Sequence, residues 1–322
     1  MKVAERNQNI AEKKRLKVSM PPRITVVGSI NMDLVVRCQA LPSAGETIIA
    51  QSSSEFCGGK GANQAVAASL AGGDVTMIGA VGDDAFATRL INNLKRHQVH
   101  CDLIQQQTGV ASGLAVIAVD SNGQNSIMVV PGANSELSPQ IVRSYETQIR
   151  KADCLMVQLE TPIESVLEAI HLARRHDVRV ILDPAPTPAE RHPALLQVDL
   201  ICPNETEAAN LTQMPVTNVN EARAASKALQ ALGAKNVVIT MGSQGAILRQ
   251  ADHTTHVPPI SVKAIDTTAA GDAFAGALAV AWSQNDDLLD AVRIANAAGA
   301  IAASRAGAQS SLASREEIES AT

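Results

Sequence analysis

The feature that most restricts the fold of this chain is a regular alternation of short apolar runs with helix-length stretches. Beyond residue 137 the pattern predicts helices at 138–150, 163–176, 205–211 and 220–232, and strands at 153–159, 178–182, 198–202 and 236–241. A hairpin near 245–257 and two Ala-rich helices at 270–283 and 287–304 follow. Strands that alternate with helices form a parallel sheet that is covered on both faces. The sequence therefore predicts an α/β fold with a doubly wound, mostly parallel sheet.

The preceding part of the chain mixes this rhythm with strands of a different kind. We expect a buried strand at 24–28, a second strand at 75–81, and helices at 61–71 and 84–97. The stretches at 33–38, 46–51, 113–120 and 124–130 are half-exposed in pattern, and the last two flank an Asn-Gly turn. A small β-sheet with strands near 33–56 and 105–130 would suit a lid over a cleft in the α/β body.

Charge is distributed unevenly along the 322 residues, which carry 27 Lys and Arg against 32 Asp and Glu. The first 23 residues are strongly basic, so we expect a disordered tail at 1–22 and the folded domain at 23–322. The acidic body and the scarcity of aromatic side chains disfavour a nucleic-acid partner. No run of 18 apolar residues exists to span a membrane. Five scattered cysteines without a CxxC pair indicate reduced thiols, which are typical of the cytoplasm.

Residues 266–272 (DTTAAGD) carry the strongest chemical signal. They lead from an extended stretch into the helix expected at 270–283. Their small side chains leave backbone N–H groups at the helix N-terminus accessible to an anion. Asp272 stands in the first turn, where an acidic side chain also interacts favourably with the helix dipole. Next to a bound phosphate, it would be well placed as the base for an attacking hydroxyl.

Two further runs suit the recognition of a polyol. Residues 58–64 (GGKGANQ) match neither the P-loop nor the GxGxxG pattern. Their glycines let a ligand reach the backbone, and Lys60 and Asn63 suit hydroxyl groups, although a flexible turn before a helix is the alternative. Residues 28–33 (GSINMD) follow the first strand, at the edge where ligands bind in open α/β sheets. Asn31 and Asp33 project to one side there, or they form an Asx turn.

Polar residues also follow two later strands. In residues 203–207 (PNETE), Asn204 and Glu207 are spaced as a box-like helix cap, which is compatible with a role at Mg²⁺ and phosphate. Residues 240–245 (TMGSQG) close another strand, where small polar side chains could meet a nucleotide. By itself this second run indicates only a turn.

These runs, in this order, resemble the ribokinase branch of the PfkB carbohydrate kinase family over residues 23–319. The resemblance implies ATP-dependent phosphorylation of the 5-hydroxyl of D-ribose, with Asp272 as catalytic base. It also implies an anion hole formed by the backbone of Ala269, Ala270 and Gly271. The sugar contacts that it implies are Asn31, Asp33, Gly59, Lys60, Asn63, Glu160 and Asp272.

The resemblance further implies a nucleotide site with Mg²⁺ and a nearby potassium ion. The nucleotide residues are Asn204, Glu207, Thr240, Gly242, Ser243, Gly245, Gly271 and Asn296, the last at a position where relatives often have His. The matching K⁺ residues, most of which would act through backbone carbonyls, are Asp266, Thr268, Ala302, Arg305, Gly307 and Ser311. Asp266 and Ser311 have side-chain oxygens suited to a hard cation. Family members commonly dimerise through the lid sheet, so we expect a cytoplasmic homodimer that binds ATP and ribose.

Other functions are compatible with parts of this pattern. A deoxyribokinase is the nearest alternative, because its substrate lacks only the 2-hydroxyl. A nucleoside kinase or a fructokinase fits the GGKGAN run less well. A catalytically silent sugar sensor on the same fold would not need the intact Asp272 and its small neighbours. An NAD-dependent enzyme would need the glycine fingerprint that this chain lacks.

Overall fold

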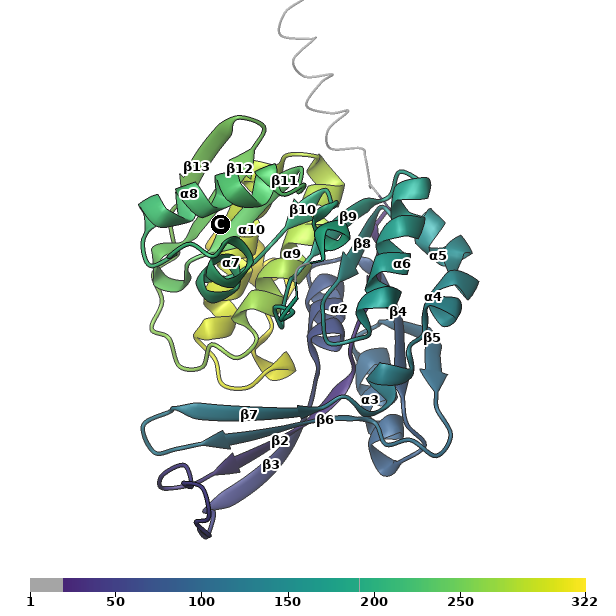
Figure 1. The fold of residues 1–322 in the computed structure, drawn as a ribbon, viewed down its shortest axis with the longest axis vertical. Coiled ribbons are helices and arrows are strands. Elements are labelled where there is room, and N and C mark those ends of the chain that lie inside the picture. Colours follow the sequence, from purple (N-terminus) through teal and green to yellow (C-terminus); the bar gives the residue numbers. More distant parts are fainter. Residues whose placement is uncertain (1–19, 191) are drawn as a thin grey trace, which may run out of the picture.

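The computed structural model describes residues 20–190 and 192–322. The basic tail expected at 1–22 therefore lies outside the described residues, apart from its last three positions. The described residues form a large sheet and a small sheet, with helices packed around the large one (Figure 1). Within the described ranges, no helix combines the length and the apolar character needed to cross a membrane.

The large sheet has nine strands in the order β13-β12-β11-β10-β9-β8-β1-β4-β5. Their bounds are β1 Arg23–Val27, β4 Asp74–Val81, β5 His100–Gln106, β8 Cys154–Val157, β9 Arg179–Leu182, β10 Leu200–Ile201, β11 Asn236–Thr240, β12 Ala246–Gln250 and β13 His253–Val257. The strands from β5 to β11 pair in parallel, and β12 and β13 add an antiparallel hairpin at one edge. The predicted doubly wound, mostly parallel sheet is thus confirmed.

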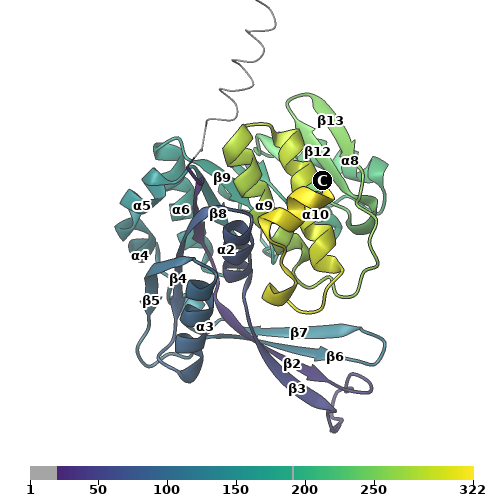
Figure 2. The same ribbon diagram turned by 180° about the vertical axis from the view of Figure 1, so that it is seen from behind.

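Helices cover both faces of this sheet, as Figures 1 and 2 show from opposite sides. One layer contains α2 (Lys60–Leu70), α3 (Ala85–Arg96), α9 (Ala270–Asn285), α10 (Leu288–Ala303) and α11 (Arg315–Ala321). The other contains α4 (Pro139–Ser144), α5 (Glu146–Lys151), α6 (Ile163–Arg175), α7 (Glu205–Thr212) and α8 (Val219–Ala231). Successive strand residues face opposite layers, so Val26 packs with the first and Val27 with the second. This two-sided burial explains why the strands consist of continuous apolar runs.

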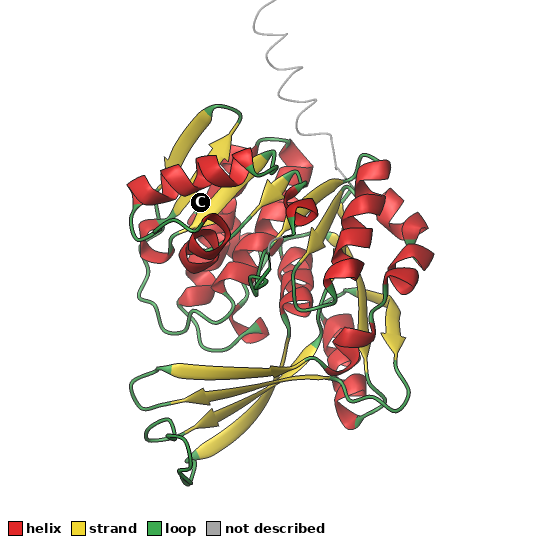
Figure 3. Cartoon of the chain, viewed as in Figure 1, coloured by secondary structure: helices red, strands yellow, loops and turns green. Residues whose placement is uncertain are grey.

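The small sheet has the order β3-β2-β6-β7 and projects from the body (Figure 3). Its strands are β2 (Asn31–Arg37), β3 (Ser52–Gly58), β6 (Gly113–Val119) and β7 (Asn125–Val130). The strand expected at 46–51 is wrong: residues 46–50 have no regular structure, and the Ser-rich run after them pairs with β2 instead. Pairing with a neighbouring strand outweighs the weak strand propensity of that run.

Two other expectations need correction. The second segment of the small sheet does not begin near residue 105, because residues 100–106 form β5 of the large sheet. This segment begins with β6 at Gly113. Cys101, Leu103 and Ile104 pack into the core of the body. The helix expected at 138–150 is divided at Tyr145 into α4 and α5.

Candidate active site

Polar side chains gather where β1, β8 and β9 end and where α2 and α9 begin. The parallel strands bring their carboxyl ends to one edge of the sheet, the usual position of a ligand site in such folds. A single hydrogen-bonded cluster results, which we call the polar cluster. Its members are Asn31, Lys60, Asn63, Gln64, Gln158, Glu160, Asp183 and Asp272.

Asp272 is buried in the first turn of α9, with 4% of its surface exposed. Its Oδ2 accepts a hydrogen bond from Asn63 Nδ2 at 2.9 Å, and its Oδ1 accepts one from Gln64 Nε2 at 3.1 Å. Burial raises the pKa of Asp272 to about 6, although Lys60 and the two amide donors oppose the rise. A held carboxylate with such a pKa can accept a proton near neutral pH.

The N-terminus of α9 also offers backbone donors next to Asp272. The N–H groups of Gly271 and Asp272 have no acceptor in the described part of the chain. The N–H of Ala270 donates to the carbonyl of Thr267 at 3.2 Å, so one of the expected anion-hole donors is engaged in this structure. A Cβ placed on Gly271 would meet open space. An anion can therefore approach this helix end, where the partial positive charge of the helix favours it.

Lys60 links the two sides of the cluster. Its Nζ lies 3.3 Å from Asp183 Oδ2 and 3.9 Å from Asp272 Oδ1. Burial alone would lower the pKa of Lys60, but Asp183, Asp272 and two further carboxylates raise it well above its ordinary value. Lys60 therefore stays charged and helps to keep Asp272 ionised.

Glu160 organises the other end of the cluster. Its Oε2 accepts hydrogen bonds from Ser29 Oγ at 2.5 Å, from the backbone N–H of Lys60 at 3.1 Å and from Asn31 Nδ2 at 3.5 Å. Asn134 Nδ2 in turn donates to Asn31 Oδ1 at 2.7 Å and fixes the orientation of the Asn31 amide. These contacts hold Glu160 and Asn31 in one preset geometry.

Asp33 differs from the other acids because it is buried without a hydrogen bond from any described residue. Burial, followed by the charges of Glu160 and Asp272, raises its pKa to about 7. Gly59 lies close by with φ +89°, and a Cβ there would come within 2.7 Å of the backbone nitrogen of Asn31. Gly59 is therefore required by its backbone conformation and by its packing against β2, and Asp33 keeps its carboxylate oxygens free of hydrogen bonds from the described residues.

A second group of the expected residues lies at the ends of β10 and β11. Asn204 and Glu207 form a complete capping box at the start of α7, so the predicted helix cap is confirmed. Thr240 bridges to Asn204, and the loop after it contains Gly242 at φ +48° and Gly245 at φ +86°. Ser243 lies between them in a short 3₁₀ turn. Glu207 belongs with the polar cluster electrostatically, since burial and then Asp183 raise its pKa.

Asn296 lies on α10 and contacts a segment next to this loop, since a Cβ on Gly245 would come within 2.8 Å of the carbonyl carbon of Pro258. Asn296 Nδ2 donates to the carbonyl of Pro258 at 3.1 Å and ties the helix to the segment after β13. This contact uses the amide nitrogen and leaves the amide oxygen as an acceptor.

A third group surrounds Asp266. Its Oδ1 accepts from the N–H of Thr268, and its Oδ2 accepts from the N–H of Gly307, each at 3.0 Å. Burial alone would raise the pKa of Asp266, but the hydrogen bond from the Thr268 hydroxyl and those from the two N–H groups outweigh burial and lower it. The Ala302 carbonyl accepts from the N–H of Arg305 at 3.1 Å, and Ser311 Oγ donates to Ala308. The guanidinium of Arg305 instead pairs with Glu317 at 2.6 Å.

Several members of these groups were not predicted from the sequence. Asp183 follows β9 directly, and a carboxylate at the end of a parallel strand is a signal that could have been used. Gln64 stands inside the GGKGANQ run but was not singled out. Ser29 holds Glu160 in place and Asn134 holds Asn31, and no local sequence pattern marks that role.

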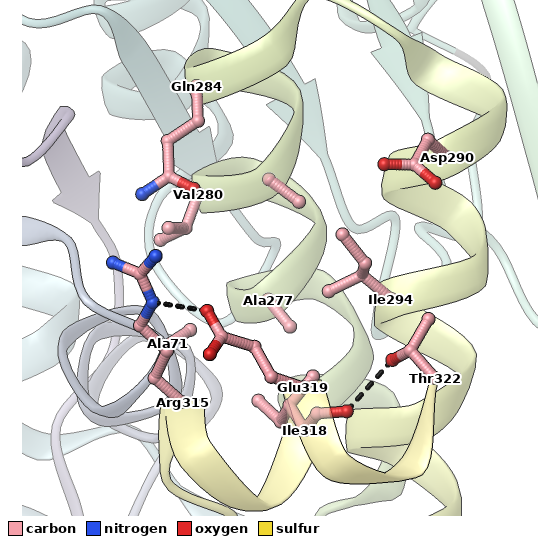
Figure 4. Close-up of a pocket in the computed structure, with 11 residues that line it drawn as sticks. Ala71, Ala277, Val280, Gln284, Asp290, Ile294, Arg315, Ile318, Glu319 and Thr322 are labelled. Carbon is pink, nitrogen blue, oxygen red and sulfur yellow. Dashed lines mark hydrogen bonds and ion pairs between the residues drawn. The ribbon is translucent and has the colours of Figure 1, made fainter. Parts of the chain in front are cut away.

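Two cavities lie outside these groups. One, of about 220 Å³, lies between α9, α10 and α11 and is lined by Ala277, Ile294 and Ile318 among others (Figure 4). Its Arg315 and Glu319 pair with each other at 2.7 Å. The other, of about 410 Å³, is mostly apolar and is lined by Leu159, Leu182 and Leu211 among others. Neither contains an expected site residue.

The family model described as "pfkB family carbohydrate kinase" matches residues 21–315. The chain belongs to the PfkB family of carbohydrate kinases. Among curated relatives, this PfkB kinase is 38% identical to a deoxyribokinase from Salmonella typhi and 38% identical to a ribokinase from Haemophilus influenzae. Both matches cover 92% of this chain and 97% of the relative. A solved structure of ribokinase from Arabidopsis thaliana in complex with ribose and ATP is 31% identical, with a TM-score of 0.88 over 94% of this chain and 99% of that one.

Proposed function

We propose that this PfkB kinase transfers the γ-phosphoryl group of ATP to the 5-hydroxyl of D-ribose, giving ribose 5-phosphate and ADP. The observation that carries the proposal is the position of Asp272, a buried carboxylate held by Asn63 and Gln64 at a helix N-terminus. A base and an anion-binding helix end stand side by side, as phosphoryl transfer to an alcohol requires. The similarity to ribokinases supports ribose as the acceptor.

In the proposed reaction, Asp272 accepts the proton of the 5-hydroxyl as the sugar oxygen attacks the γ-phosphorus. The bond from that phosphorus to the bridging oxygen breaks, and ADP leaves. We assign stabilisation of the transferred group to the backbone of residues 269–272, with Gly271 and Asp272 as donors not used elsewhere in the described chain. A pKa of about 6 leaves Asp272 ionised at neutral pH while it remains basic enough to accept the proton.

We place the sugar against the polar cluster. The proposed contacts are Asn31, Asp33, Gly59, Lys60, Asn63 and Glu160. Asp33 supports this placement most directly, because a buried carboxylate without a protein donor can accept two hydroxyl groups. The preset geometry of Glu160 and Asn31 lowers the entropy lost on binding.

We place ATP along the ends of β10 and β11. The proposed contacts are Asn204, Glu207, Thr240, Gly242, Ser243, Gly245 and Gly271. The adenine base of ATP would lie toward Asn296. A Cβ on Gly242 would meet open space, which supports backbone access at this loop. Asn204 and Glu207 would hold Mg²⁺ near the phosphates, since carboxylate and amide oxygens fit this hard cation. When bound, Mg²⁺ would neutralise developing phosphate charge.

We also propose a potassium site near the start of α9, formed by Asp266, Thr268, Ala302, Arg305, Gly307 and Ser311. Asp266 fits this role because hydrogen bonds from two segments keep it anionic and fixed in place. Oxygen donors suit a hard cation. The cation would add positive charge near the helix end that we assign to the phosphoryl group.

We further propose that the small sheet acts as a lid and as a dimer interface. Its strand β7 exposes Ile127, Met128, Val129 and Val130, an apolar patch that a second copy of the chain could cover. A cytoplasmic location is proposed with it, since the five cysteines are free thiols.

A sugar-panel assay tests the proposed function. ADP release is measured with ATP, Mg²⁺ and ribose, 2-deoxyribose, fructose or a nucleoside, with and without K⁺. We expect the highest kcat/KM for ribose and an increase with K⁺. A site that hydrogen-bonds the 2-hydroxyl rejects the deoxy sugar strongly. A preference for 2-deoxyribose would instead support the activity named for the Salmonella relative, and no ADP release with any pentose would support a sugar sensor.

A further inference from the structure

A row of side-chain amides leads from the far side of α2 to Asp272. Asn93 Nδ2 on α3 donates to Gln309 Oε1 in the 3₁₀ turn Gln309–Ser311. Gln309 Nε2 donates to Asn63 Oδ1 at 3.0 Å, and Asn63 Nδ2 donates to Asp272 Oδ2 at 2.9 Å. We call these three amides the amide relay. Gln309 and Asn63 are 7% and 5% exposed, so water does not readily replace their partners.

The direction of every hydrogen bond in the amide relay is set by Asp272. An ionised carboxylate only accepts, so Asn63 must turn its nitrogen to Asp272 and its oxygen away. Gln309 must then present its nitrogen to Asn63 and its oxygen to Asn93. Reversing one amide forces the next to reverse, because two oxygens or two nitrogens would otherwise face each other.

We propose that Gln309 is a positioning residue, which keeps Asn63 turned so that its amide nitrogen donates to Asp272. Asn93 has the same role one step further away, since it keeps Gln309 in the required orientation. Neither residue belongs to the polar cluster, and both act through Asn63. The inference rests on the proposed function in one respect, namely that Asp272 is the catalytic base.

The hydrogen bond at the end of the relay matters because it stabilises the ionised form of Asp272. The charged groups that face Asp272 are Lys60 on α2, Asp183 after β9, Glu207 on α7 and Asp33 on β2. Three of these four are acids, so loss of the donor from Asn63 leaves Lys60 and Gln64 to offset them. The pKa of Asp272 then rises, and the acidic limb of the kcat profile moves to higher pH.

The test uses two substitutions at Asn93. A merely structural role predicts the larger effect for the substitution that removes more atoms, whereas the amide relay predicts the opposite order. Asn93→Asp keeps the shape of the side chain but can only accept, so it turns Gln309 and then Asn63 around. Asn93→Ala removes more atoms, yet it leaves Gln309 free to donate to Asn63. We expect Asn93→Asp to move the acidic limb up by about one pH unit, the size of one charge-assisted hydrogen bond, and therefore to lower kcat by up to about tenfold below pH 6. Asn93→Ala should change kcat and the acidic limb less than Asn93→Asp does, because it removes a partner of Gln309 without turning Gln309 around.

Two further variants separate orientation from other effects. Asn92→Asp adds the same charge at the neighbouring, exposed position of α3, and we expect it to leave the acidic limb in place. Gln309→Met keeps the volume and removes the donor to Asn63 without turning Asn63 around, so its effect is expected to lie between those of Asn93→Ala and Asn93→Asp. Equal effects of the two Asn93 variants, or equal effects of Asn92→Asp and Asn93→Asp, would overturn the assignment.

A readout independent of turnover is the side-chain amide of Asn63, observed by NMR in protein with ¹⁵N-labelled asparagine side chains. Its resonance is identified as the one that Asn63→Ser removes. We expect it to follow the ionisation of Asp272 near pH 6 in the unmodified kinase and in Asn93→Ala, and not in Asn93→Asp. The same titration in Asn93→Asp would refute the relay. If no pentose is phosphorylated, the proposed function fails, and this titration still decides the relay.

Discussion

Lys60 Nζ lies between Asp183 Oδ2, at 3.3 Å, and Asp272 Oδ1, at 3.9 Å, so two acids share one half-buried ammonium group. Asp183 raises the pKa of Asp272, whereas Lys60 lowers it. Asp183 therefore disfavours the ionised form of Asp272 in two ways, by direct repulsion and by drawing Lys60 toward itself. This competition is not visible in the sequence, because it depends on the contact between α2 and the end of β9.

Replacing Asp183 by Asn should lower the pKa of Asp272, because repulsion is removed and Lys60 is released toward Asp272. The acidic limb of the kcat profile should move to lower pH, by up to about one unit. The control Asp199→Asn breaks a lysine pair with a 2.6 Å contact outside the polar cluster, and it should leave the limb in place. Movement of the limb to higher pH in Asp183→Asn would contradict the assigned electrostatics.

Replacing Asp33 by Asn should stabilise the fold while it weakens sugar binding. Burial raises the pKa of Asp33 to about 7 in the folded chain. Because the pKa of Asp33 is higher in the folded chain than in the unfolded chain, the stability linked to its protonation is fully present below the unfolded pKa of about 4. This stability is lost as the pH rises to 7. Removing the charge should therefore raise the free energy of unfolding at pH 8 by about 2 kcal/mol, and much less at pH 4.

The same variant should raise KM for ribose about tenfold or more, since a hydrogen bond from a hydroxyl to a carboxylate is lost. In the unmodified kinase, KM should increase as pH falls below about 7, and this dependence should disappear in Asp33→Asn. Asp102→Asn, on the exposed side of β5, serves as control for both measurements. A variant that is less stable at pH 8 than the unmodified kinase would refute the burial argument.

Gly59→Ala should disturb the proposed sugar site more than backbone strain alone explains. Gly59 and Gly45 have similar positive φ values, +89° and +82°. A Cβ on Gly45 meets nothing within 4 Å, whereas one on Gly59 comes within 2.7 Å of the Asn31 nitrogen. Gly45→Ala should cost about 1 kcal/mol of unfolding free energy, and Gly59→Ala about 3 kcal/mol. Only Gly59→Ala should raise KM for ribose, and an equal cost for both variants would mean that contact with Asn31 is unimportant.

Asn204→Ala and Asn218→Ala remove comparable helix caps, at the starts of α7 and α8. Each should lower the unfolding free energy by about 1 kcal/mol. Asn204→Ala alone should also raise KM for ATP, because Asn204 orients Glu207 at the proposed Mg²⁺ and phosphate site. If the two variants leave KM for ATP equal, Asn204 acts only as a helix cap.

The parts of the fold that follow from local patterns could be predicted from the sequence. The strands of the large sheet are continuous apolar runs because both faces are buried, and that pattern is visible without a structure. The cap at Asn204 and the acid in the first turn of α9 could be predicted for the same reason. The strand β3 could not, since its Ser-rich run forms a strand only by pairing with β2.

The candidate site could be predicted only where its residues lie in compact runs. Asn63 and Asp272 stand in such runs, and the structure joins them by a hydrogen bond. Gln309 and Asn93 stand in ordinary helical or turn sequence, and they reach the site through contacts across more than 200 positions of the chain. Long-range contacts of this kind leave no local spacing to recognise.

The measurement that tests the central claim most directly is a comparison of Asp272→Asn with the unmodified kinase in two assays. Turnover is measured by ADP release, and ribose binding is measured by calorimetry without nucleotide. We predict that kcat falls about a thousandfold or more, because the base is removed, while the Kd for ribose changes by less than about threefold. Retention of a substantial fraction of kcat would contradict the assignment of Asp272 as the catalytic base.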